Sequence, residues 1–283
     1  MVALAEISVG ADAVTADPAS PKAETAAAAR PQPIAASALS RTFGGVHAVE
    51  AMSITLQRGE LLGLIGPNGA GKTTLFNLIA GALRPTAGRI VVEGRDVTAE
   101  SADKRIARGL CRTFQIPKPF PEMTVLENVL VGAQRQAGER LLPNFLTPGR
   151  VAGEERRAVE KARELIEFVT LTDVAYQHAR VLSGGQRKLL ELARVLMAEP
   201  SIILLDEPAA GVNPRLLELI IDRVQQLSRQ GRSILLIEHN MELVARLCTR
   251  VVVMASGRHL AEGTPAEVAN DPAVIDAYLG DRP

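Results

Sequence analysis

The sequence predicts an α/β fold built on a mainly parallel sheet, and three features indicate it. Short, largely apolar segments of four or five residues recur along the chain, as expected of strands buried on both faces. Amphipathic helical patterns lie between these segments, and polar or glycine-rich residues follow several of them. The segments are Leu61–Ile65, Ser201–Leu205, Ser233–Ile237 and Val251–Met254.

A glycine-rich loop follows the first of these strands. Residues 66–73 match the pattern G-x-x-x-x-G-K-[ST], and Leu75–Ala80 then predicts a helix that Gly81 ends. Glycines allow backbone N–H groups to converge on phosphate oxygens, and the helix N-terminus adds a positive dipole end. Lys72 supplies a positive charge for the β- and γ-phosphates, and Thr73 supplies a hydroxyl for Mg²⁺. The context of strand, loop and helix therefore predicts a nucleotide site rather than a plain turn.

Composition excludes several classes of protein. The 283 residues are 47% hydrophobic, with 32 basic and 32 acidic side chains, so nothing indicates a strongly basic nucleic-acid binder. The cysteines, Cys111 and Cys248, form no metal-ligand pattern, and we expect both to be small buried residues in a reducing compartment. No apolar run approaches the roughly 20 residues that cross a bilayer.

The chain divides into a tail and one large domain. Residues 1–33 are rich in alanine and lack aromatic residues, so we expect a disordered tail and no signal peptide. Residues 34–283 form the domain, and it starts with strand-like segments around a Gly44-Gly45 turn. Phe43 lies beside that turn, and by itself a phenylalanine favours core packing over a platform for a nucleotide base.

The middle of the chain, from about 117 to 182, reads as a mainly helical block inserted between strands of the sheet. Gln115 precedes a proline-rich loop, and a lone glutamine there is equally an ordinary surface amide. Thr124 and Glu127 predict a capped helix, residues 141–153 an irregular insertion, and residues 154–169 an amphipathic helix.

Two further stretches of sequence allow both a structural and a chemical interpretation. Ser183 and Gln186 form a capping-box pattern ahead of a strong amphipathic helix, and two glycines between them leave an exposed helix N-terminus suited to an anion. Asp206 and Glu207 end one buried strand, and His239 follows another. Acidic residues at the carboxyl ends of such strands suit Mg²⁺ coordination and activation of a water molecule.

Taken together, these residues resemble the ATP-binding subunits of ABC transporters over residues 36–281. Residues 66–73 resemble the Walker A motif, Leu182–Gln186 the family signature, Ile202–Asp206 the Walker B motif, Glu207 the catalytic glutamate, Gln115 the Q-loop glutamine and His239 the switch histidine. The resemblance implies a P-loop NTPase core, an N-terminal antiparallel β subdomain and an inserted helical subdomain. It also changes the interpretation of Phe43 from core packing to base stacking, because Phe43 falls where the family places its base-stacking aromatic residue.

The resemblance implies three sets of site residues. Catalysis is assigned to Lys72, Gln115, Glu207 and His239, and Mg²⁺ binding to Thr73, Gln115 and Asp206. ATP contacts are assigned to Phe43, Gly66, Pro67, Asn68, Gly69, Ala70, Gly71, Lys72, Thr73, Thr74, Ser183, Gly184, Gly185 and Gln186. Asn213 departs from the family pattern, since many members have an aspartate there; it keeps hydrogen bonding but loses the charge.

Within the family the chain resembles the ATPase subunits of branched-chain amino-acid importers. The resemblance lies in Arg112–Gln115, the insertion near 141–153, Pro208–Pro214 and the ending from Asp271 to Gly280. Subunits for urea, short amides, aromatic acids or lipopolysaccharide export share parts of this pattern. A soluble ABC ATPase acting on DNA or ribosomes, and a nucleotide-gated module without hydrolysis, are further alternatives.

The resemblance also implies partners and a location. Two ATPase subunits, identical or paralogous, would enclose two ATP molecules head to tail, each signature facing the other subunit's ATP. Two membrane permease chains would complete the transporter, a solute-binding protein would deliver the solute, and no nucleic acid would be involved. The subunit would lie on the cytoplasmic face of the bacterial inner membrane. Phe120, Met123, Val125 and Leu126 would form a docking surface, although core packing explains them equally well.

Overall fold

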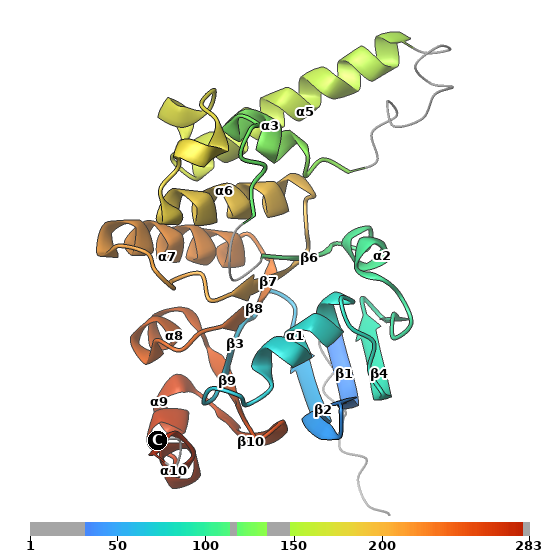
Figure 1. Ribbon diagram of the computed structural model, residues 1–283, viewed down its shortest axis with the longest axis vertical. Helices are drawn as coiled ribbons and strands as arrows, with labels where there is room; N and C mark the ends of the chain where they lie inside the picture. The colour runs from blue at the N-terminus through green and yellow to red at the C-terminus, as the bar shows by residue number, and fades with distance from the viewer. Residues whose placement is uncertain (1–31, 114–117, 135–147, 280–283) are drawn as a thin grey trace, which may run out of the picture.

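A computed structural model describes residues 32–113, 118–134 and 148–279, which contain two sheets and the helices around them. Figure 1 shows the larger sheet in the middle, with helices α3, α5 and α6 gathered at one end of the molecule and α9 and α10 at the other. The tail expected over residues 1–33 lies almost wholly outside the described residues.

The larger sheet confirms the predicted α/β fold. Its strand order is β10-β9-β3-β8-β7-β6, and only β10 runs antiparallel to its neighbour. Strands β3, β7 and β8 are buried along their whole length, because helices and the second sheet cover both faces. The strands are β3 (Leu61–Ile65), β6 (Leu110–Arg112), β7 (Ile202–Asp206), β8 (Ser233–Ile237), β9 (Arg250–Ala255) and β10 (Arg258–Gly263).

The smaller sheet is antiparallel, as the family resemblance implies, and has the order β2-β1-β4-β5. A turn at Gly44 and Gly45, both with positive φ, joins its first two strands. Helix α1 (Lys72–Ala80) lies between the two sheets, where Phe76 is fully buried with residues from both. The strands are β1 (Ile34–Phe43), β2 (Val46–Leu56), β4 (Ala87–Val92) and β5 (Arg95–Asp96).

The opposite face of the larger sheet packs against the remaining long helices. Leu205 and Leu236 of the sheet belong to one buried cluster with Leu189 and Val224 of the helices. This cluster also extends into the helical block expected near 117–182. The elements are α2 (Ala102–Ile106), α3 (Val125–Leu130), α5 (Pro148–Phe168), η2 (Thr172–Val174), η3 (Ala179–Val181), α6 (Gly184–Met197), α7 (Pro214–Arg229), α8 (Met241–Leu247), α9 (Pro265–Ala269) and α10 (Pro272–Leu279).

Several local predictions are confirmed and one is wrong. The capping boxes Thr124–Glu127 and Ser183–Gln186 both form with reciprocal hydrogen bonds. The expectation of irregular structure over residues 141–153 fails for its described part, because α5 already begins at Pro148. Proline is tolerated in the first turn of a helix, where its missing N–H has no intrahelical partner.

Both cysteines are buried as expected. Cys111 is 4% exposed and Cys248 is 6% exposed. Burial raises the pKa of Cys111 to about 11 and that of Cys248 to about 12, because the thiolate is poorly solvated there. Among the described residues, no helix is both long enough and apolar enough to span a bilayer.

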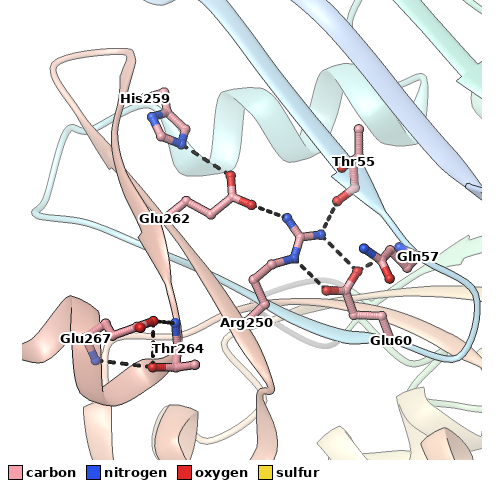
Figure 2. A network of polar contacts seen from close by, with 8 residues as sticks. All are labelled: Thr55, Gln57, Glu60, Arg250, His259, Glu262, Thr264 and Glu267. Atoms are coloured by element: carbon pink, nitrogen blue, oxygen red, sulfur yellow. Dashed lines mark hydrogen bonds and ion pairs between the residues drawn. The ribbon is translucent and has the colours of Figure 1, made fainter. Parts of the chain in front are cut away.

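Arg250 ties the two sheets together (Figure 2). Its Nε and Nη2 atoms donate to both carboxylate oxygens of Glu60, at 2.7 and 2.9 Å, and Nη2 also donates to the carbonyl of Thr55 at 2.7 Å. Nη1 donates to Glu262 at 2.5 Å. One guanidinium thus joins β2, β9, β10 and the turn before β3, in the fork geometry that carboxylates match best.

Replacing Arg250 by Met should lower the free energy of unfolding by about 2–4 kcal/mol, because Glu60 then keeps a largely buried charge without its cation. Urea denaturation followed by circular dichroism measures the change. Arg258→Met is the matched control: its ion pair with Glu50 is exposed and should contribute less than about 1 kcal/mol. Equal losses in the two variants would contradict the assignment of Arg250 as a structural tie.

Candidate active site

The glycine-rich loop is held where only glycine fits. It joins β3 to α1, and Gly66 and Gly71 have φ values of 147° and 93°. A Cβ atom on Gly66 would come within 2.0 Å of the Met254 carbonyl oxygen, and one on Gly71 within 2.2 Å of the Ala48 carbonyl oxygen. The loop therefore lies directly against the backbones of β9 and β2, which fixes its curvature.

Lys72 is the first residue of α1 and curls back into the loop. Its Nζ donates to the carbonyls of Gly66 and Pro67 at 2.7 and 2.8 Å, and the side chain is almost fully buried. These two hydrogen bonds hold the ammonium group among the backbone atoms of the loop. An anion bound in the loop would meet this charge together with the N-terminus of α1.

A cavity of about 330 Å³ brings the predicted residues of several elements together. The loop and the start of α1 form one wall, and Glu207 and His239, which follow β7 and β8, face it. Parallel pairing of β3, β8 and β7 explains the meeting, since the carboxyl ends of all three strands lie at one edge of the sheet. The cavity is lined by Ala48, Asn68, Gly69, Ala70, Gly71, Lys72, Thr73, Thr74, Glu207 and His239.

Asp206, the last residue of β7 and the neighbour of Glu207, is buried and does not line this cavity. Its Oδ2 accepts a hydrogen bond from Arg112 Nη2 at 3.0 Å, whereas its buried Oδ1 has no hydrogen-bond partner. Burial raises the pKa of Asp206 above its usual value, and the nearby Arg112 opposes that rise. A buried carboxylate oxygen without a donor is a group that a hydrated cation can satisfy.

The donor set fits Mg²⁺ in the manner of a nucleotide site. The described residues contain no group of three or more His, Cys, Asp or Glu side chains placed to hold a metal. Mg²⁺ bound with a nucleotide needs no such cage, because phosphate oxygens and water supply most of its six ligands. The Thr73 hydroxyl and the Asp206 carboxylate are of the hard oxygen type that this cation prefers.

Glu207 and His239 form a close pair. His239 Nε2 lies 2.7 Å from Glu207 Oε1. Glu207 has a φ of 46°, which is an uncommon backbone conformation for a residue with a side chain. Lys188 of α6 donates from Nζ to the Glu207 carbonyl at 2.5 Å. Burial lowers the pKa of Lys188, and the charge of Glu238 is the largest effect opposing that decrease.

The cavity lining does not include the predicted residues Gly66, Pro67 and Asp206. Three further predicted groups also lie outside the lining or outside the described residues. Ser183, Gly184, Gly185 and Gln186 begin α6 and do not line the cavity. Gln115 lies outside the described residues. Phe43 is 43% exposed at the end of β1, with the Arg41 guanidinium 4.7 Å from its ring centre, so the core packing that its residue type favours is wrong.

Sequence reasoning missed three charged residues around Asp206 and Glu207. Arg112 pairs with Asp206, Lys188 holds the Glu207 carbonyl, and Glu238 accepts hydrogen bonds from two backbone N–H groups. Glu238 directly precedes His239 at the end of a buried strand. This position in the sequence could have indicated that it belongs to the site. Arg112 and Lys188 lie on a strand and a helix with no local motif that indicates their partners.

Family models and curated relatives match most of this sequence. A family model described as "ABC transporter" matches residues 49–210, and one described as "Branched-chain amino acid ATP-binding cassette transporter" matches residues 258–282. A probable branched-chain amino acid transport ATP-binding protein LivG of Archaeoglobus fulgidus is 40% identical, over 86% of this chain and 93% of its own. The high-affinity branched-chain amino acid transport ATP-binding protein BraF of Pseudomonas aeruginosa is 39% identical, over 87% and 96%.

Solved structures agree with these relatives. The crystal structure of a nucleotide-free ATP-binding cassette from an ABC transporter superimposes with a TM-score of 0.77 at 37% identity, covering 88% of this chain and all of the other. The ADP conformation of an ATP-binding cassette superimposes with a TM-score of 0.76 at 36% identity, covering 88% and 99%. Family model, relatives and structures converge on one conclusion: the chain belongs to the ABC transporter family, as one of its ATPase subunits.

Proposed function

We propose that this chain is the ATP-hydrolysing motor subunit of an importer for branched-chain or related amino acids. The observation that carries the proposal is the cavity in which Lys72 lies opposite the paired Glu207 and His239. The solute class is taken from the names of the relatives and from the family model that matches residues 258–282.

In this proposal the loop and Lys72 hold the phosphates of ATP by backbone N–H groups and one mobile charge. Thr73 and Asp206, with Gln115 as the family resemblance implies, would hold Mg²⁺, and the ion would neutralise charge on the phosphates. Glu207 orients and deprotonates the attacking water, and His239 keeps the Glu207 carboxylate in place through their 2.7 Å contact. The exposed ring of Phe43 provides a flat surface for the adenine base.

The signature residues act on a second subunit in the proposed assembly. Ser183, Gly184 and Gln186 begin α6 away from the cavity of their own chain. Two subunits arranged head to tail would bring each signature to the ATP of the other, where backbone N–H groups of the helix N-terminus face the γ-phosphate. Hydrolysis would remove that anion and with it the attraction that closes the pair.

The proposed membrane partners are two transmembrane permease chains, which hold this subunit on the cytoplasmic face of the bacterial inner membrane and are served by a solute-binding protein. Of the four apolar residues expected to dock there, Phe120 and Met123 are 46% and 38% exposed and remain candidates. Val125 is fully buried in the core, and Leu126 packs against the same core cluster, so neither supports a docking role.

Affinity purification of the tagged chain from gently solubilised membranes, followed by mass spectrometry, tests the assembly. We expect two permease chains with several membrane spans, a second ATPase and a solute-binding protein whose bound solute identifies the cargo. Recovery of permeases for urea, short amides or aromatic acids, or for lipopolysaccharide export, would change the proposed solute accordingly. Recovery of soluble or nucleic-acid-associated partners alone would overturn the transporter role.

Lys72→Ala should weaken ATP binding by about 10- to 100-fold, because a charge-assisted contact to phosphate contributes about 1.5–3 kcal/mol. Isothermal titration calorimetry of the purified chain measures the dissociation constant. Lys161→Ala is the control, since Lys161 pairs with Glu199 on the helical surface and should leave the affinity unchanged. Equal affinity in Lys72→Ala and the wild type would refute the role of the loop.

Glu207→Gln should retain ATP binding and lose about 10²–10⁴-fold in the rate of hydrolysis, since an amide cannot accept the proton of the attacking water. Phosphate release measured under single-turnover conditions gives the rate, and size-exclusion chromatography with ATP should reveal an accumulating dimer. Turnover near that of the wild type would remove Glu207 from the reaction.

A further inference from the structure

Glu238 is a buried acid that none of the family motifs includes. It follows β8, is 3% exposed, and uses both carboxylate oxygens. Oε1 accepts a hydrogen bond from the backbone N–H of Ala209 at 2.9 Å, and Oε2 accepts one from the backbone N–H of His239 at 3.1 Å. One side chain thus holds two backbone segments that are about 30 residues apart in sequence.

These two segments carry the paired groups of the active site. Ala209 lies two residues after Glu207, and His239 is itself the partner of Glu207. A backbone hydrogen bond from Glu207 N–H to the Ile237 carbonyl, 3.0 Å long, continues the pairing of β7 with β8 up to this point. Beyond it, the Glu238 carboxylate links the two backbones through Ala209 and His239.

The backbone at Glu207 needs such support. Its φ of 46° is unfavourable for a residue with a side chain and persists only where the surroundings hold it. Lys188 holds the carbonyl of Glu207 from one side, and Glu238 holds the N–H of Ala209 from the other. Between them they fix both ends of the turn that aims the Glu207 carboxylate at His239.

The chemistry of Glu238 suits this task better than that of its amide. Two N–H donors converge on the side chain, so two acceptor oxygens are needed, and a glutamine would turn its own NH₂ group toward one of them. A buried carboxylate is costly unless it is hydrogen-bonded and balanced by positive charge. The two N–H groups provide the hydrogen bonds. Lys188 provides positive charge, since among the charges that oppose the lowering of the Lys188 pKa by burial, that of Glu238 is the largest.

We propose that Glu238 is a positioning residue for hydrolysis, whose carboxylate holds the Ala209 and His239 backbones so that His239 and Glu207 stay in contact. The inference rests on the proposed function, since it concerns the same hydrolytic site. It assigns Glu238 no contact with ATP. Its loss should therefore reduce turnover and leave nucleotide affinity unchanged.

The test compares E238Q with E60Q in the full-length chain. Glu60 is also a largely buried carboxylate, 9% exposed at its side chain, but it lies before β3, at the sheet edge opposite the loop. For E238Q we expect kcat to fall about 10- to 100-fold, the cost of misplacing reacting groups, with an unchanged Kd for MgATP by calorimetry. E60Q should lose thermal stability and keep kcat within about twofold of the wild type.

A double-mutant cycle with H239A separates positioning from simple destabilisation. If Glu238 acts through His239, adding E238Q to H239A should cost far less than E238Q costs alone, whereas E60Q should have the same effect in both backgrounds. A kcat of E238Q within twofold of the wild type, or equal losses in both backgrounds, overturns the inference. If E238Q does not fold, E238D, which keeps the charge on a shorter arm, takes its place with the same expectations. A wild-type chain without ATPase activity would instead refute the proposed function.

Discussion

Parallel pairing of β3, β8 and β7 is the constraint on which the rest of the structure depends. It puts three carboxyl ends side by side, and each end delivers one part of the chemistry: the glycine-rich loop, the acid pair and the histidine. Because the register of neighbouring strands is fixed by their buried apolar side chains, the relative height of these groups is set by the core and not by the loops. A change of register between β7 and β8 would therefore separate Glu207 from His239.

The two faces of the larger sheet pack against different elements. One face packs on α1 and the antiparallel sheet, which closes the loop against β2 and β9. The other packs on the long helices and continues into the helical block. Arg250 fastens the antiparallel sheet to the strands that carry the site, whereas α6 connects the helical block to Glu207 through Lys188. The site is therefore supported from both layers.

Much of this arrangement could be predicted from the sequence, because its signals are local. Apolar runs such as 61–65, the capping boxes at Thr124 and Ser183, and the acids that end β7 each depend on neighbouring residues alone. Contacts between distant segments have no such signal. The link from Glu238 to Ala209, the exposure of Phe43 and the burial of Val125 are decided by tertiary packing. The early start of α5 was hidden by Pro148 and Gly149, which usually interrupt helices but are tolerated in a first turn.

The burial of both cysteines has a practical consequence. The sequence contains no cysteine beyond Cys111 and Cys248. With thiol pKa values near 11 and 12, hardly any reactive thiolate exists at neutral pH, and the sulfur atoms are shielded from reagents. A single cysteine introduced on an exposed helical surface would therefore be the only site that a maleimide dye labels quickly. Fluorescence energy transfer between two such labelled chains could then follow opening and closing in the otherwise native sequence.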